Sequence, residues 1–208
     1  MKRIGITGGI ATGKSTVTAI LRNKNYIVID ADSVNHRLME PGQSLYQKLI
    51  EAFGDSILVD KRNIQSLIDR ANLGAIIFSS DAERKRLNEI AHPVIYEEIL
   101  HQLDYYSTIK VNNGIIFIDI PLLFETWDKA ENLKLDQVWL VYTDEEIQTQ
   151  RLMKRNALSL QEAKDRLQSQ MSIEDKVKLA DIVIDNRGSL EDLDEQVERA
   201  LNQINEWM

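Results

Sequence analysis

Eight residues near the start of the chain have the types and the spacing of a site that binds phosphate groups. Residues 8–15 read Gly-Gly-Ile-Ala-Thr-Gly-Lys-Ser and match the pattern G-x-x-x-x-G-K-[ST] in full. The glycines, Gly8 and Gly13 among them, let backbone N–H groups approach the phosphates of a nucleotide, and the following helix adds the positive end of its dipole. Lys14 would place an ammonium between the phosphates, and the Ser15 hydroxyl suits Mg²⁺. The pattern predicts binding of a nucleoside triphosphate, with a chance match in a Gly-rich turn as the alternative.

Acidic residues follow two apolar segments further along the chain. Asp30 and Asp32 lie at the end of one of them, and Asp32 is favoured as the carboxylate that orients an acceptor hydroxyl and takes its proton. Asp32 could also help to hold Mg²⁺, and Asp30 could instead cap a helix or support the loop. Asp119 ends the other segment, where an acid can contact Mg²⁺ directly or through water, or can cap the next segment.

Basic residues recur at helical spacing between residues 148 and 178. Arg151 and Arg155 are four residues apart, so they share one face of a helix. A mobile helical lid with arginines could place positive charge on the moving phosphoryl group and exclude water. Charges of this kind also occur on solvated surface helices, and it is the phosphate loop upstream that favours a lid. On local evidence alone, Arg70 and His92 have no assigned role.

Five apolar runs, rich in Ile and Val, predict parallel strands that are covered on both faces. They are residues 4–7, 26–30, 115–119, 137–142 and 182–184. Helical patterns lie between them, so the predicted fold class is α/β, with a P-loop NTPase-type five-stranded parallel sheet flanked by helices. A helical insertion over the sheet's carboxyl edge is read as a substrate region, although it could merely pack the core. The predicted parts are a core at about 1–40, 104–147 and 180–208, the insertion at about 41–103, and a lid at about 148–179.

Composition excludes several classes of protein. The net charge of −8 argues against a broad basic surface for nucleic acid, so phosphate groups must be met by local Lys and Arg. The absence of cysteine excludes disulfides and fits a reducing compartment. No apolar run approaches the roughly 18 residues that a membrane span needs. We therefore expect a cytoplasmic protein that binds neither nucleic acid nor a membrane and has no evident obligate protein partner.

Seven ordered strings of the sequence resemble the dephospho-CoA kinase family across nearly the whole chain. The most distinctive is Asp-Ile-Pro-Leu-Leu-Phe-Glu at residues 119–125. The others are residues 4–17, 29–32, 40–42, 69–78, 92–93 and a set that combines Gln148, Arg151, Arg155, Gln170 and residues 180–188. The resemblance implies a kinase that moves the γ-phosphoryl group of ATP, with Mg²⁺, to the ribose 3′-hydroxyl of dephospho-CoA.

The resemblance also implies roles for individual residues. Asp32 is similar to the family's proposed general base, while Arg70 and His92 fall in its CoA-binding helical region. Arg151 and Arg155 resemble lid arginines, and Asn186 lies in the loop expected near the adenine of ATP. The residues expected to bind the ATP phosphates are Gly8, Ala11, Thr12, Gly13, Lys14, Ser15 and Thr16.

Two departures from the family pattern qualify these expectations. Ala11 stands where the family often has glycine, which is tolerable if its φ stays negative. Not every member has an acid matching Asp119.

The rival functions are a kinase of the same fold acting on a nucleoside or nucleoside monophosphate, and a nucleotide-binding switch. The chain lacks the Asn-Lys-x-Asp guanine motif of GTPases.

Overall fold

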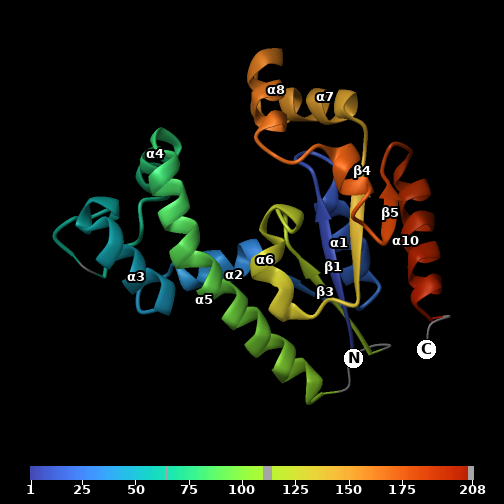
Figure 1. Cartoon of the computed structure of the whole chain (residues 1–208), viewed down its shortest axis with the longest axis horizontal. Helices are drawn as coiled ribbons and strands as arrows, with labels where there is room; N and C mark the ends of the chain where they lie inside the picture. The colour runs from blue at the N-terminus through green and yellow to red at the C-terminus, as the bar shows by residue number, and fades with distance from the viewer. Residues whose placement is uncertain (64, 110–113, 206–208) are drawn as a thin grey trace. The chain divides into compact units, whose positions relative to one another are not determined.

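The computed structural model describes residues 1–63, 65–109 and 114–205, and the chain divides into two units. Unit 1 combines the N-terminal segment Met1–Asp30 with Tyr106–Met208, and unit 2 is Ala31–Tyr105. Unit 1 carries the sheet and the phosphate-binding motif, whereas unit 2 consists mainly of helices (Figure 1).

Five parallel strands form a single sheet in unit 1, in the order β2-β3-β1-β4-β5. They are β1 (Lys2–Gly8), β2 (Ile27–Asp30), β3 (Ile115–Asp119), β4 (Gln137–Tyr142) and β5 (Ile182–Asp185). The predicted fold class is therefore confirmed. The strands differ from the prediction only at their ends, because pairing along the sheet extends β1 beyond its most apolar residues.

The carboxyl ends of the strands bring polar residues to one edge of the sheet. Asp119 lies opposite Ile6 of β1 and opposite Asp30 of β2, so two carboxylates end neighbouring strands in register. On the other side of β1, Gly8 lies opposite Val141 of β4. The phosphate-binding motif therefore leaves the sheet at the edge where ligands bind in open α/β sheets.

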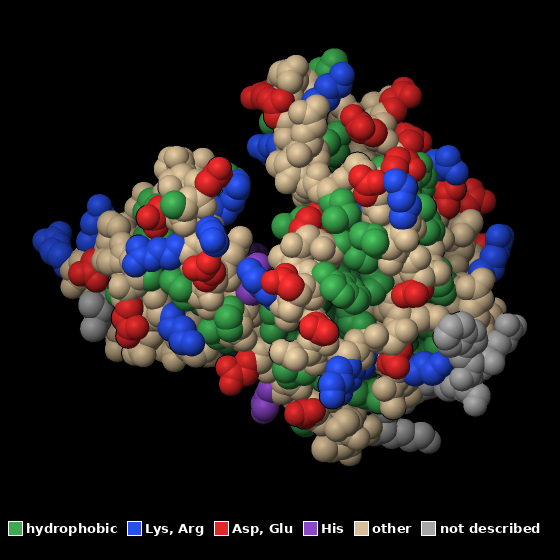
Figure 2. All heavy atoms as spheres, viewed as in Figure 1, with side chains coloured by type: hydrophobic (Ala, Val, Ile, Leu, Met, Phe, Trp, Pro, Cys, Tyr) green, Lys and Arg blue, Asp and Glu red, His purple; other side chains and the backbone are tan. Residues whose placement is uncertain are grey.

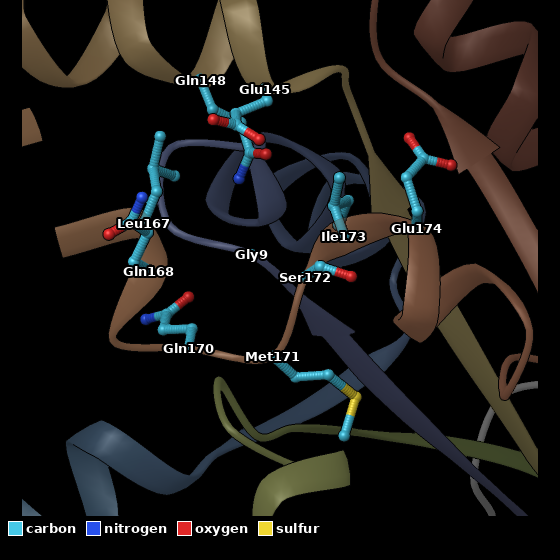
Figure 3. Close-up of a pocket in the computed structure, with 10 residues that line it drawn as sticks. All are labelled: Gly9, Glu145, Gln148, Leu167, Gln168, Gln170, Met171, Ser172, Ile173 and Glu174. Atoms are coloured by element: carbon cyan, nitrogen blue, oxygen red, sulfur yellow. The ribbon is translucent and has the colours of Figure 1, made fainter. Parts of the chain in front are cut away.

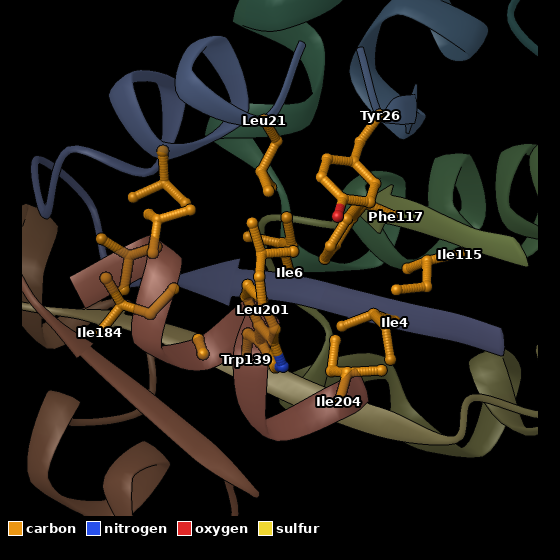
Figure 4. Packing of buried hydrophobic residues seen from close by; sticks show 14 of the residues in the cluster. Ile4, Ile6, Leu21, Tyr26, Ile115, Phe117, Trp139, Ile184, Leu201 and Ile204 are labelled. Atoms are coloured by element: carbon orange, nitrogen blue, oxygen red, sulfur yellow. The ribbon is translucent and has the colours of Figure 1, made fainter. Parts of the chain in front are cut away.

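The main hydrophobic core lies between the sheet and two helices, α1 (Lys14–Asn23) and α10 (Leu190–Asn205). Figure 4 shows the alternate residues Ile4 and Ile6 of β1 pointing into it. Three aromatic rings cross the core edge to face: Tyr26 and Phe117 have centroids 5.5 Å apart, and Phe117 and Trp139 5.1 Å. This packing holds β1 and α1, and hence both ends of the phosphate-binding motif.

Short helices with clear caps complete unit 1. Asp144 caps α7 (Glu145–Asn156) by accepting the N–H of Ile147 at 2.9 Å. Ser159 and Glu162 form a capping box at the start of α8 (Leu160–Gln168). The remaining elements are η3 (Phe124–Thr126), α6 (Trp127–Ala130), η4 (Glu131–Leu133) and α9 (Ile173–Val177).

Unit 2 is helical in its described residues, apart from an isolated antiparallel bridge between Leu58 and Ile68. It contains α2 (Ala31–Leu38), α3 (Ser44–Phe53), η1 (Asp55–Ile57), α4 (Arg70–Ser79) and most of α5 (Asp81–Ser107). Its buried residues follow the helical spacing of the sequence and include Leu45, Leu49, Val94, Ile99 and Leu103. Its role as a substrate region stays a prediction.

The surface carries charges of both signs. Figure 2 shows Lys and Arg interspersed with Asp and Glu on the visible face; the chain has 25 basic and 33 acidic residues and a net charge of −8. Within the described ranges, no helix has the length and apolar character needed to cross a membrane.

Candidate active site

The residues that match the phosphate-binding motif form a tight loop between β1 and α1. Thr12 is buried and turns back on Gly9, whose carbonyl oxygen accepts both the Thr12 N–H at 3.3 Å and its hydroxyl at 2.9 Å. Gly13 precedes α1 in a left-handed conformation with φ of 90°, and its carbonyl oxygen accepts the Thr16 N–H at 2.9 Å. Lys14 is therefore the first residue of the helix, at the positive end of its dipole.

Side chains from distant elements hold the outer side of this loop. Asn186, just after β5, donates its Nδ2–H to the carbonyl oxygen of Thr12 at 2.7 Å. Arg151 of α7 donates to the same oxygen at 3.4 Å and to the carbonyl oxygen of Asn186 at 3.1 Å. The Thr12 carbonyl oxygen thus accepts hydrogen bonds from two side chains, which link the loop to α7 and to the end of β5. The place of Asn186 near the adenine stays a prediction.

Gly13 is required here by space as well as by conformation. A Cβ built on this residue would lie 2.0 Å from the Nδ2 atom of Asn186. A side chain at this position would therefore break the hydrogen bond from Asn186 to Thr12. The second glycine of the motif thus lets β5 approach the loop closely.

Ala11 departs from the expectation made for it. Its φ is +62°, so the condition that φ stays negative is wrong. The loop needs this residue in the left-handed region to turn between Gly9 and Gly13, which explains why glycine suits the position. Alanine in this region costs about 1–2 kcal/mol because its Cβ crowds the following carbonyl oxygen.

Lys14 and Asp119 meet directly beside the loop. The Lys14 ammonium donates a hydrogen bond to the carboxylate of Asp119, whose side chain is 5% exposed. Each of these nearly buried charges compensates the other. The end of β3 is thereby tied to the start of α1, and the acid proposed for Mg²⁺ lies next to the lysine proposed for phosphate.

The donor groups near the loop fit Mg²⁺ that arrives with a nucleotide. Ser15 follows Lys14 in the first turn of α1 and is exposed. Mg²⁺ is usually held by one or two carboxylates together with substrate phosphates and water. The hydroxyl of Ser15 and the carboxylate of Asp119 match that chemistry. Among the described residues, no group of three His, Cys, Asp or Glu side chains could hold a metal ion without such a ligand.

The two arginines of α7 have different surroundings. Arg151 contacts the phosphate loop, as described above, whereas Arg155 is exposed and donates to Asn156 Oδ1 at 3.0 Å. Spacing alone put them on one face, but only the arginine nearer the start of the helix reaches the loop. Their roles in phosphoryl transfer stay predictions.

A cavity of about 290 Å³ lies beside Gly9 of the loop (Figure 3). Its walls are α7 and residues 167–174. The charged side chains that line it are Glu145 and Glu174, and the described lining includes no Lys or Arg. Such a lining would repel the phosphate groups of a ligand.

An ion pair fixes the turn that carries Asn186. Arg187 donates to both carboxylate oxygens of Asp185, at 2.9 Å and 2.7 Å for the shortest contacts, and these hydrogen bonds hold the pKa of Asp185 below its ordinary value. The Arg187 guanidinium also lies over the ring of Tyr142, 5.4 Å from its centroid. The hydrogen bond that Tyr142 donates to Glu174 is the largest cause that raises the pKa of the Tyr142 phenol, and burial raises it further.

The three residues predicted to contact the substrate that accepts the phosphoryl group, Asp32, Arg70 and His92, all belong to unit 2. Asp32 is exposed in the first turn of α2, which starts directly after β2 ends at Asp30. The Oδ2 atom of Asp30 lies 3.9 Å from the Nη2 atom of Arg22. Arg70 is the exposed first residue of α4, and His92 is half-buried in α5, with its ring edge to face with Tyr96 at 6.1 Å.

The family model for dephospho-CoA kinase matches residues 2–192. The chain belongs to the dephospho-CoA kinase family. The family and the kinase function that the sequence predicted are thereby confirmed.

Individual relatives and solved structures are similar to the chain over nearly its whole length. The dephospho-CoA kinase of Oceanobacillus iheyensis is 45% identical over 206 residues, which cover 97% of each chain. A solved dephospho-CoA kinase from Campylobacter jejuni is 32% identical, with a TM-score of 0.69 over 98% of each chain. A crystal structure from Thermus thermophilus is 33% identical, with a TM-score of 0.78 over 97% of each chain.

Sequence reasoning missed one set of contacts in this dephospho-CoA kinase family member. Gln148 and Gln170 both bond to Ile10 in the phosphate loop, and Glu125 pairs with the buried Lys176. In the sequence, the two glutamines and Glu125 stand out only as parts of family strings. The glutamines are uncharged and carry no charge pattern, and Glu125 is far from Lys176 in the sequence, so their place in those strings is the signal for all three.

Proposed function

We propose that the chain transfers the γ-phosphoryl group of ATP to the ribose 3′-hydroxyl of dephospho-CoA and gives CoA and ADP. The observation that carries this proposal is the phosphate loop with Lys14 and Asp119 beside it, in a chain of this family. The loop N–H groups would bind the phosphates of ATP, and Lys14 would neutralise charge on the phosphoryl group as it moves.

Asp32 is the proposed general base. During transfer, the 3′-oxygen forms a bond to the γ-phosphorus, the bond to the β–γ bridging oxygen breaks, and the hydroxyl proton passes to the Asp32 carboxylate. Its exposure at the start of α2, two residues after β2, supports this role because the carboxylate is open to a substrate.

Arg70 and His92 are proposed to bind dephospho-CoA. Arg70 places a cation in the first turn of α4, where the helix dipole disfavours positive charge. A phosphate group of the substrate would be attracted by both the guanidinium and the helix. We assign the helical region at about 41–103 to this substrate and the segment at about 148–179 to a lid.

Mg²⁺ would be held by Ser15 and Asp119 and, when bound with ATP, would neutralise charge on the β- and γ-phosphates. Arg151 and Arg155 would add positive charge from the lid, and Asn186 would border the adenine. The location in the cytoplasm and the independence from a protein partner stay predictions.

A coupled assay of ADP release, with and without dephospho-CoA, tests the proposal, and mass spectrometry of the product identifies CoA. We expect ADP release to depend on dephospho-CoA and Mg²⁺. The rival kinase function predicts instead that a nucleoside or nucleoside monophosphate from a substrate panel is phosphorylated faster. ADP release at the same rate with and without every tested acceptor substrate would contradict both kinase assignments.

A further inference from the structure

Two glutamine side chains hold the backbone of Ile10 in the phosphate loop. Gln148 of α7 donates its Nε2–H to the carbonyl oxygen of Ile10 at 2.7 Å. Gln170, between α8 and α9, accepts the N–H of Ile10 with its Oε1 atom at 3.0 Å. Figure 3 shows the two glutamines reaching toward the loop near Gly9, one from α7 and one from the segment after α8. Both backbone groups of Ile10 are therefore bonded to side chains.

The hydrogen bond from Gln148 to Ile10 depends on the absence of a side chain at Gly9. A Cβ on Gly9 would lie 2.6 Å from the Nε2 atom of Gln148. Gln148 is 3% exposed, so losing its partner would leave a buried amide without compensation. This contact is thus built into the packing of α7 against the loop.

The backbone next to Gln170 is bonded to Glu125, which lies beside a buried lysine. Glu125 of η3 accepts the N–H of Met171 at 3.1 Å, and the same carboxylate oxygen lies 2.7 Å from the ammonium of Lys176. The side chain of Lys176 is 0% exposed. Burying a charge is costly unless it is paired, so Lys176 keeps Glu125 in place and Glu125 keeps the segment at residues 170–171 in place.

We propose that Gln148 and Gln170 are positioning residues that fix the Ile10 backbone so that the loop is ready to bind ATP before the nucleotide arrives. Glu125 and Lys176 hold Gln170 in position. The inference rests on the proposed function, because it assumes that this loop binds ATP. Fixing a loop in advance removes the entropy cost of ordering it on binding. A loop freed at Ile10 could rotate its peptide groups and would bind ATP more weakly.

Three variants test this hold: Gln148→Met, Gln170→Met and, as a matched control, Gln150→Met. Methionine keeps the length of glutamine but lacks its amide. Gln150 is on the same helix as Gln148 but is exposed and bonds to Glu146 on the surface. The measurements are the dissociation constant of a non-hydrolysable ATP analogue, kcat, the melting temperature, and the exchange rate of the Ile10 amide proton by NMR.

We expect each Met variant at Gln148 or Gln170 to weaken binding of the analogue about tenfold and to lower kcat. Gln170→Met should also speed exchange of the Ile10 amide proton. The double variant should lose less than the product of the single losses, because both glutamines act on one residue. Gln170→Glu keeps an acceptor oxygen and should restore protection of the Ile10 amide.

Binding by the variants within twofold of the original chain would overturn the inference, as would an equal loss in Gln150→Met. A lowered melting temperature with unchanged affinity would show that the glutamines merely stabilise the fold. If the original chain did not bind the analogue, the proposed function would be wrong. Exchange of the Ile10 amide in Gln170→Met would still test the hold, since it needs no nucleotide.

Discussion

Asn186 and Gly13 approach each other so closely that a Cβ on Gly13 would lie 2.0 Å from the Asn186 side-chain nitrogen. The same nitrogen donates to the carbonyl oxygen of Thr12 at 2.7 Å, so the loop and the end of β5 are joined where the helix α1 begins. One glycine therefore serves both the left-handed backbone and the contact between two segments that are far apart in the sequence.

Gly13→Ala should abolish measurable binding of an ATP analogue and destabilise the chain. The new Cβ displaces Asn186, and alanine in the left-handed region costs about 1–3 kcal/mol. Gly42→Ala is a matched control, since Gly42 has a similar φ of +86° but no atom within 4 Å of its built Cβ. The control should lower the melting temperature and keep its affinity in calorimetric titration. Normal affinity in Gly13→Ala would contradict the role given to this contact.

Ala11→Gly should stabilise the chain by up to about 1 kcal/mol, because glycine adopts the left-handed conformation without strain. Part of this gain is offset by the greater freedom of glycine in the unfolded chain. The melting temperature should rise by roughly 2–4 °C for each kcal/mol. Ala157→Gly is a control at the end of α7, where φ is +52°. Both variants should gain stability, and a loss in Ala11→Gly would contradict the account of the loop.

Arg151→Ala should raise the dissociation constant of the ATP analogue and lower kcat, because Arg151 bonds to the loop itself. Arg155→Ala should lower only kcat, since its guanidinium does not touch the loop and would act once the lid carries it to the phosphoryl group. Steady-state kinetics combined with titration separate the two effects. If Arg155→Ala kept its full kcat, Arg155 would belong to the surface alone.

Asp32→Asn should keep ATP affinity and lower kcat by about 10² to 10⁴, which is the usual contribution of a general base. Asparagine has nearly the same shape but cannot accept the proton. The dependence of the rate on Mg²⁺ distinguishes the two possible roles of this residue. A base variant stays slow at every Mg²⁺ concentration, whereas a weakened metal site recovers as Mg²⁺ is raised. A variant with unchanged kcat would remove Asp32 from the mechanism.

The ion pair of Asp185 and Arg187 should make stability depend on acid pH. The pKa of Asp185 is lower in the folded chain than in the unfolded chain, chiefly through its hydrogen bonds to Arg187. Its contribution is therefore complete above the unfolded value, about 3.9, and is lost as the pH falls through the lower folded value. Melting temperatures of Asp185→Asn and the original chain should differ most near neutral pH and converge in acid. In Arg187→Gln, NMR should show the Asp185 carboxyl titrating at a higher pH.

The sheet could be predicted from the sequence because its strands are short runs of Ile and Val that are buried on both faces. The motif at residues 8–15 predicted a loop between a strand and a helix in the same way, since its glycines and Lys14 have a defined spacing, and this loop lies between β1 and α1. Both signals are local, so they need no knowledge of which segments meet in the folded chain.

The contacts around the loop could not be predicted, because they depend on how distant segments pack. Ala11 takes a positive φ that its side chain does not favour, since the closure of the loop outweighs the local cost. Arg151 and Arg155 share a helix face by spacing, yet only Arg151 is close enough to Thr12 to bond with it. Family resemblance identified Gln148 and Gln170 but could not say what they touch.

The bond between Asn186 and Thr12 spans 174 positions of the sequence, and this has a consequence for biosynthesis. During synthesis, the loop leaves the ribosome well before the strand that closes it has been made. At about 5–20 residues per second, a nascent chain carries an unfinished loop for roughly ten to thirty-five seconds. If nucleotide binding needs the closed loop, its stabilisation of the chain begins only after β5 has joined the sheet.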